Sequence, residues 1–457
     1  MPAPELLRRV LPRGEFSRNV LTLVAGTGIA QVIVVVSSPI VTRLYTPADY
    51  GLYSVATSIM TILIAVTCLR YEFAVLLPAT DETAANVVAL ALLVNLGMSM
   101  ASFVFLGLAG ASILTLLSAA AVGPYVLLVT LGQLGGGAAG TLVNWAVRTK
   151  TFSEIAAFRL IQAVALVTVQ VGLGVVGLGS AGLMLGDVTG RISGSSRLAR
   201  SAWRTNAAAF RRVSRAGIAA AARRYRWFPT FSSPSALMNA LGLEVPLLSV
   251  VAFYGAANGG RYALADRACA IPLTLVAAAV GQVYLAEVAR NARDQPAAVR
   301  GLFLRTTRSL ARMAIGPAIL LAALGPLLAG PVFGPNWSET GLFVAILAPM
   351  YFVAFVTAAT GDTLYVVERL DLQLVREVVR LVLLGGAVPL AAASGLSATG
   401  AIVLLSAAGC LNYSLYGLIS WYAIVAAPRR SRPTGEAPAA ADPVATHADG
   451  DDAAGIP

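Results

Sequence analysis

The chain has 457 residues, of which 57% are apolar and only 12% are charged. Soluble domains carry about 25% charged residues, so this composition excludes a disordered protein and argues against water-soluble globular domains. The class of protein that fits this composition is a polytopic membrane protein. Its formal net charge of +11 is then expected to reflect the topology of the loops rather than binding of nucleic acid. The three cysteines lie in apolar stretches without metal-ligand spacing, so neither a disulfide framework nor a metal site is expected.

Apolar stretches long enough to cross a bilayer occur twelve times along the chain. A transmembrane helix needs about 20 predominantly apolar residues. The first stretch is too long for the apolar region of a signal peptide, so we expect it to be an uncleaved anchor. In chain order the predicted spans are 20–42, 50–69, 85–108, 123–146, 157–177, 180–196, 230–252, 262–286, 313–332, 341–365, 377–393 and 400–426.

The basic residues predict how these spans are oriented. If the N-terminus is cytoplasmic, 30 of the 33 Lys and Arg residues fall on the cytoplasmic side, as the positive-inside rule requires. The three exceptions are Arg43, Arg261 and Arg267. We therefore predict that both termini are cytoplasmic.

A long basic segment divides the chain into two sets of six spans, which predicts an all-α fold of two six-helix lobes around a central cavity. The basic segment is expected to lie at the cytoplasmic membrane surface, and the Ala-, Pro- and Asp-rich end of the chain is expected to be disordered. The predicted parts are a basic cytoplasmic N-terminus (1–19), an N-lobe (20–196), a basic cytoplasmic linker (197–229), a C-lobe (230–426) and a cytoplasmic tail (427–457).

Internal similarity indicates that the two lobes arose by duplication. LYTPADYGLY in the first half matches FYGAANGGRY in the second at an offset of 209 residues, and Gly177-Leu178 recurs as Gly395-Leu396. Transporters built from parallel repeats place the substrate between the two halves. The pairs matched at the offset of 209 include Tyr45 with Tyr254, Gly51 with Gly260 and Tyr53 with Tyr262.

Charged residues at membrane depth are the candidate functional residues. Such a residue at the centre of a span costs about 2.5–3.5 kcal/mol on insertion scales, so it usually faces a partner or a wet cavity. The alternatives are that such a residue snorkels to an interface, forms an internal ion pair or makes a structural hydrogen bond. The predicted cavity residues are Arg43, Arg70, Glu72, Glu244, Asp266 and Arg267, and the candidates for ion coupling are Asp187, Glu244 and Asp362.

Motifs for enzymatic chemistry are missing from the sequence. The only lysine, Lys150, is not part of a phosphate-binding loop, and the only histidine, His447, lies in the polar tail. We therefore expect no catalytic residue, cofactor or metal.

Several phrases resemble a known family. SRNVLTLVAGTGIAQVI, TRLYTPADYGLYSVATSI and LRYEFAVLLPATDETAANVV resemble the start of bacterial polysaccharide-biosynthesis membrane proteins, and FYGAANGGRYALADRACAIP resembles their spans 7 and 8. Tyr45-Thr46-Pro47, Tyr50-Gly51 and Arg70-Tyr71-Glu72 carry the likeness in the first half. These proteins are the flippases of O-antigen and exopolysaccharide repeat units, in the multidrug/oligosaccharidyl-lipid/polysaccharide exporter superfamily.

The resemblance implies translocation of an undecaprenyl-diphosphate-linked oligosaccharide by alternating access across the bacterial cytoplasmic (inner) membrane. It implies the polymerase and glycosyltransferases of the same pathway as partners. Arginines on spans 1, 2, 7 and 8 hold the diphosphate in such flippases, and Arg70 and Arg267 lie on matching spans here, with Arg43 as a further candidate.

Three other functions stay open at this point. A related multidrug/cation antiporter predicts a cavity dominated by carboxylates. A membrane enzyme would need a large outer loop or paired carboxylates at the outer face, and in the loop before the tenth span Glu339 alone faces that side. A structural scaffold leaves the membrane-depth charges unexplained.

Overall fold

The computed structural model describes residues 15–116, 120–291, 296–361, 363–366 and 369–426, and nearly all of them are helical. Six long helices make up the first half: α2 (Glu15–Leu44), α3 (Pro47–Thr67), α5 (Asp81–Leu116), α6 (Val126–Arg148), α7 (Phe152–Val175) and α8 (Ser180–Arg211). Five make up the second: α10 (Ser233–Asn291), α11 (Pro296–Phe333), α12 (Ser338–Gly361), α14 (Leu370–Ala393) and α15 (Ala398–Ala426). Short elements connect them: α4 (Tyr71–Ala74), η1 (Ala120–Tyr125), α9 (Arg215–Arg224), η2 (Phe228–Ser232), η3 (Pro335–Trp337) and α13 (Thr363–Val366).

Twelve membrane crossings follow from these helices. Among the described residues, nine helical segments are long and apolar enough to span a bilayer. α8 and α14 are more polar but of similar length, and α10 contains two crossings because Gly255, with φ of 83°, interrupts it. A residue with positive φ ends an α-helical path, and glycine adopts it without steric cost. The prediction of an all-helical polytopic membrane protein is confirmed.

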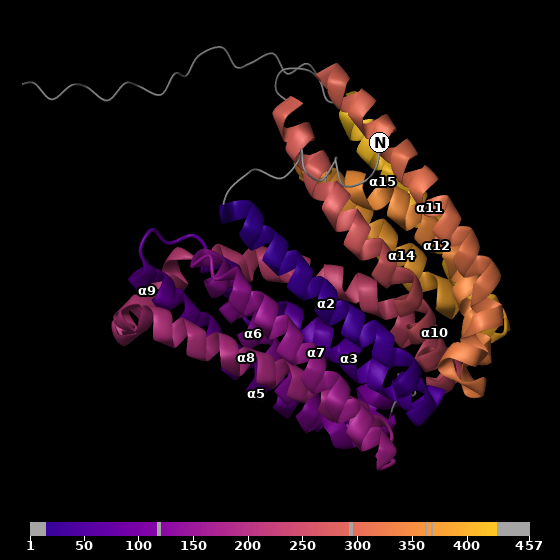
Figure 1. The fold of residues 1–457 in the computed structure, drawn as a ribbon, viewed down its shortest axis with the longest axis horizontal. Helices are drawn as coiled ribbons and strands as arrows, with labels where there is room; N and C mark the ends of the chain where they lie inside the picture. The colour runs from indigo at the N-terminus through magenta and orange to yellow at the C-terminus, as the bar shows by residue number, and fades with distance from the viewer. Residues whose placement is uncertain (1–14, 117–119, 292–295, 362, 367–368, 427–457) are drawn as a thin grey trace, which may run out of the picture.

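The helices form two bundles, one from each half of the chain (Figure 1). They meet along α3 and α10, which pack extensively against each other, and they diverge toward the end at which α2 begins. We call the end where α2 finishes and α3 begins the closed end, and the opposite end the open end.

Three contacts join the bundles at the closed end. Gly51 of α3 lies against the backbone of α10 near Gly260, and a side chain at either position would overlap the other helix. Trp337 donates from Nε1 to the carbonyl oxygen of Thr42 at 2.7 Å, and Arg43 donates to the carbonyl oxygen of Pro331 at 2.7 Å. The helices α3 and α10 can approach this closely because Gly51 and Gly260 have no Cβ atom.

The internal duplication is visible in matching turns of the two halves. After α7, Gly177 has φ of 81° and Leu178 N donates to the carbonyl oxygen of Leu173 at 3.1 Å. After α14, Gly395 has φ of 70° and Leu396 N donates to Ala391 O at 3.0 Å. This pairing is the left-handed glycine cap of a helix C-terminus, so the sequence match at these two positions corresponds to one repeated turn.

The structure differs from the predicted boundaries around the basic linker. The sixth span was expected to end at 196, but α8 continues to Arg211 with one non-helical residue, Asn206. The linker therefore consists largely of the end of α8 and of α9. Its Ala- and Arg-rich sequence favours helix, and a helix can leave the bilayer without breaking. The predicted outer loop 253–261 is likewise helical except at Gly255.

The linker packs onto the N-terminal bundle. Ser214 N, just before α9, donates to Asn86 Oδ1 of α5 at 3.1 Å, and Arg212 forms an ion pair with Glu82. Phe210 and Ile218 pack against the apolar cluster around Trp145. The N-terminus up to residue 14 and the tail from residue 427 lie outside the described residues.

Candidate functional site

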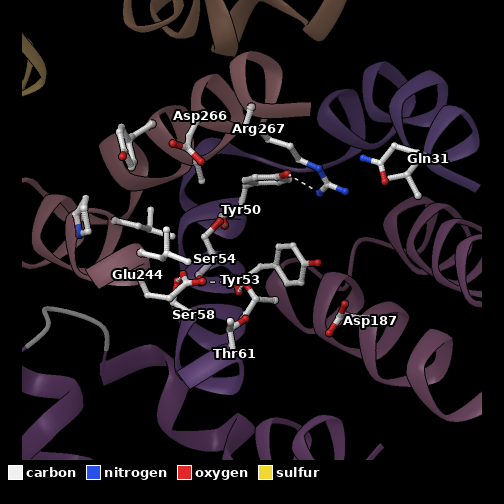
Figure 2. A pocket seen from close by; sticks show the side chains of 18 of the residues that line it. Gln31, Tyr50, Tyr53, Ser54, Ser58, Thr61, Asp187, Glu244, Asp266 and Arg267 are labelled. Atoms are coloured by element: carbon white, nitrogen blue, oxygen red, sulfur yellow. Dashed lines mark hydrogen bonds between the residues drawn. The ribbon is translucent and has the colours of Figure 1, made fainter. Parts of the chain in front are cut away.

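A cavity of about 680 Å³ lies between the two bundles. This volume is within the usual range of about 300–1,000 Å³ for ligand sites. α2, α3, α7 and α8 of the first half contribute lining residues, as do α10, α12, α14 and α15 of the second. Figure 2 shows side chains from both halves pointing into the same space. The charged lining residues are Arg159, Asp187, Arg191, Glu244, Asp266 and Arg267.

Arg267 reaches the cavity from α10 and contacts α3. Its Nη1 donates to the hydroxyl of Tyr50 at 3.4 Å, and in Figure 2 the side chain of Gln31 points toward the same guanidinium. Tyr50 is held in place by edge contacts with Tyr53 and Trp337, whose ring centroids lie 5.7 and 5.6 Å away. Among the described residues, no carboxylate forms an ion pair with Arg267.

Two further arginines enter from the first half. Arg191 of α8 forms an ion pair with Asp187 one turn before it, with Nε and Oδ2 2.6 Å apart. Arg159 of α7 has its guanidinium 5.3 Å from the centroid of the Phe158 ring, and no described carboxylate pairs with it. Asp187 therefore compensates Arg191, while Arg159 lies in the cavity wall without an acidic partner.

The other two cavity carboxylates already have hydrogen-bond donors. Glu244 of α10 accepts from Ser58 Oγ of α3 at 2.5 Å, which links the two halves inside the cavity (Figure 2). Asp266 accepts from the hydroxyl of Tyr351. Ser58 and Tyr351 are neutral donors, so Glu244 and Asp266, like Arg159 and Arg267, have no partner of opposite charge among the described residues within ion-pair distance.

This arrangement favours an anionic ligand. Leaving a desolvated charge without a partner costs several kcal/mol, and guanidinium groups bind phosphate oxygens through short, charge-assisted hydrogen bonds. The six charged lining residues are formally neutral in sum, and the guanidinium groups of Arg159 and Arg267, which no described carboxylate pairs with, are the groups that an anion would bind.

Three predicted site residues lie elsewhere. Arg70 and Glu72 follow the end of α3, where they pair with each other at 3.8 Å, and the Arg70 guanidinium lies 4.2 Å from the centroid of Phe73. Arg43 is at the closed end, bonded to Pro331. The expectation that they line the cavity differs from the structure, because Arg70 and Glu72 lie beyond the end of α3 and Arg43 reaches from the last turn of α2 to α11. Asp362 lies outside the described residues.

Glu72 is buried in a short turn of helix beyond the span. It is 9% exposed, and its Oε2 has no hydrogen-bond partner. Burial raises the pKa of this carboxyl, while hydrogen bonding to the backbone and the nearby Arg70 act in the opposite direction. The residue therefore affects stability at one end of the N-terminal bundle rather than the chemistry of the cavity.

Sequence reasoning missed Arg159, Arg191, Gln31 and Tyr50 as lining residues. Arg159 and Arg191 were assigned to cytoplasmic segments, although Arg191 follows Asp187 by four residues and so shares its helix face. Of the predicted residues, the structure brings together Asp187, Glu244, Asp266 and Arg267 in the cavity wall. Among the described residues, no group of three or more His, Cys, Asp and Glu could hold a metal ion.

Comparison with known proteins gives a family and a fold. The model of the family described as polysaccharide biosynthesis protein matches residues 40–341. No curated protein matches the chain in sequence.

Solved structures share the fold at low sequence identity. A multidrug resistance MATE family transporter of the MOP superfamily, in an inward-facing conformation, has a TM-score of 0.70 at 12% identity, over 87% of this chain and 95% of that one. The lipid II flippase MurJ, inward closed, has a TM-score of 0.67 at 13% identity, over 87% of each chain. An outward-facing MATE family transporter has a TM-score of 0.51 at 13% identity, over 92% and 98%.

Proposed function

The chain belongs to the polysaccharide biosynthesis protein family, and we propose that it is a flippase that moves an undecaprenyl-diphosphate-linked oligosaccharide across the bacterial cytoplasmic membrane. By family and fold it stands with transporters and not with enzymes. Glu339, the acidic residue that an outer-face enzyme would have used, forms an ion pair with Arg261 at 2.7 Å instead.

The observation that carries the proposal is the pair of arginines without carboxylate partners. Arg267 of α10 and Arg159 of α7 lie in the wall of one cavity but belong to opposite bundles. A diphosphate offers oxygens to both at once, so binding would compensate both charges. The polyprenyl chain would stay in the lipid while the polar head crosses between the bundles.

A mechanism of alternating access agrees with a molecule that is closed at one end and open at the other. If the positive-inside rule places the N-terminus in the cytoplasm, the open end faces the cytoplasm and the cavity is accessible to a substrate made there. The higher similarity to an inward-facing than to an outward-facing relative supports this orientation. Translocation would require the Gly51–Gly260 contact to separate while the open end closes.

A multidrug/cation antiporter is the second candidate. The three carboxylates of the cavity favour it, because an organic cation could be bound by Glu244 or Asp266. Against it, Asp187 is paired with Arg191, and binding a cation would leave Arg159 and Arg267 without a partner of opposite charge.

The test is movement of a fluorescent undecaprenyl-diphosphate glycan between leaflets of proteoliposomes. Arg267→Gln and Arg159→Gln should each slow it about 10- to 100-fold, since a hydrogen bond to a charged group contributes about 1.5–3 kcal/mol. Arg70→Gln is the matched control, because Arg70 does not line the cavity, and it should stay within about twofold of the unaltered protein.

Two results would contradict the proposal. Unaltered rates in both cavity variants would remove the diphosphate assignment. Absence of lipid movement together with efflux of organic cations would establish the antiporter in its place.

A further inference from the structure

A second cavity, of about 390 Å³, lies within the C-terminal half between α10, α12, α14 and α15. It shares three lining residues, Ala270, Tyr351 and Tyr413, with the central cavity. The two spaces are therefore neighbours, and a ligand whose head is held by Arg267 could extend into the second one. Its volume alone is sufficient for a small-molecule ligand.

The polar groups of this second cavity are only partly satisfied by the protein. Arg380 Nη2 donates to Asn239 Oδ1 at 3.0 Å and lies 2.6 Å from Glu377 Oε2, but its buried Nε has no hydrogen-bond partner. Asn412 is 3% exposed, lines the cavity and has no hydrogen-bond partner among the described residues. The Arg380 Nε atom is fully buried and does not reach a ligand in the cavity. The Asn412 side chain lines the cavity, so a ligand that supplies oxygen atoms can accept a hydrogen bond from its amide.

Aromatic rings form much of the remaining wall. Tyr351, Phe355, Tyr413 and Tyr416 all line the cavity, and the Arg376 guanidinium lies 3.9 Å from the centroid of the Tyr416 ring. Rings of this kind present an apolar face beside a polar tip. A phosphate group has oxygen atoms but no apolar surface, whereas a sugar ring has hydroxyl oxygens at its edge and C–H groups on its faces.

We propose that the second cavity binds one sugar residue of the lipid-linked glycan while Arg267 and Arg159 hold the diphosphate. The Asn412 amide donates to an oxygen of the sugar, and the tyrosines pack against its ring. This inference rests on the proposed flippase function and adds to it a site that discriminates between glycans.

The experiment measures binding by the full-length protein in detergent to undecaprenyl diphosphate alone and to four probes that carry one sugar each: glucose, galactose, N-acetylglucosamine or glucuronic acid. The unaltered protein should bind at least one sugar-bearing probe about fivefold more tightly than the bare lipid, as one hydrogen bond from the Asn412 amide allows. Asn412→Leu, which keeps the volume of the side chain but removes its amide, should remove this difference.

Affinity for the bare lipid should change less than about twofold in Asn412→Leu. Asn144→Leu on α6, outside both cavities, is the matched control and should retain the preference. Thermal unfolding of each variant confirms that it is folded.

Each outcome points to one conclusion. Equal binding of bare and sugar-bearing lipids by the unaltered protein, or equal loss for both kinds of probe in Asn412→Leu, would overturn the sugar site and leave the flippase proposal intact. Binding of no diphosphate lipid at all would instead overturn the proposed function.

Discussion

Gly51 of α3 and Gly260 of α10 lie so close at the closed end that a Cβ atom added to Gly51 would be 3.0 Å from the amide nitrogen of Gly260 and would overlap the carbonyl oxygen of Ala256. The two glycines occupy matching positions in the two halves of the sequence. The contact that closes this end, which we call the seal, is therefore made between equivalent segments of the two repeats.

Replacing either glycine should open this end. Gly51→Ala or Gly260→Ala introduces overpacking that costs about 1–3 kcal/mol, which would shift the equilibrium between separated and closed bundles about 5- to 150-fold. Spin labels at Ala48 and Ala257 should report a longer distance by pulsed electron resonance. Gly97→Ala, where a Cβ would meet no atom within 4 Å, should leave the distance unchanged; the same distance in all variants would show that the glycines do not form the seal.

If the turns at Gly177 and Gly395 are equivalent, the same substitution should change the free energy of unfolding by a similar amount in both halves. A Cβ at Gly177 or Gly395 would meet nothing within 4 Å, so alanine there adds only the strain of a positive φ. Each substitution should lower the free energy of unfolding by about 1–2 kcal/mol, and by similar amounts in the two halves. Gly172→Ala, in the regular helix just before the first turn and equally free of neighbours, should be neutral or slightly stabilising.

The Asp187–Arg191 pair gives a prediction about the cavity wall. Asp187→Asn leaves Arg191 without its partner and should destabilise the folded protein on the order of 2 kcal/mol, less than the 3–5 kcal/mol of a fully buried pair because the cavity admits water. The double variant Asp187→Asn, Arg191→Gln should regain most of the loss in thermal unfolding. Additive losses would mean that the two side chains contribute independently.

Glu72 gives a prediction about pH. Because burial raises the pKa of its carboxyl in the folded protein, the protonated form is favoured on folding. Stability from this group is present below the unfolded pKa, about 4.3, and is lost as pH rises through the folded pKa. The stability difference between Glu72→Gln and the unaltered protein, measured by chemical unfolding in detergent, should therefore increase with pH above about 4.3. A difference independent of pH would show that Glu72 does not titrate in this way.

The pattern of apolar stretches determined most of the fold. Twelve crossings, two sets of six, the family resemblance and the repeated turns at Gly177 and Gly395 are all properties of the linear sequence, because a bilayer requires about 20 apolar residues per crossing and a tight helix end requires glycine. The boundaries near the basic linker were less well predicted, because a helix such as α8 can continue into water without any signal in its hydropathy.

Only the tertiary structure decided which charges face the cavity. Asp266 and Arg267 were recognised in the sequence, but the tyrosine that holds Arg267 lies 217 residues away, and Arg159 and Arg191 were counted only among the basic residues of the cytoplasmic side. Arg70 looked equally suited to the site and lies outside the cavity. The depth of a residue along a span follows from the sequence, whereas the direction of its side chain depends on how each helix is rotated and packed against the others.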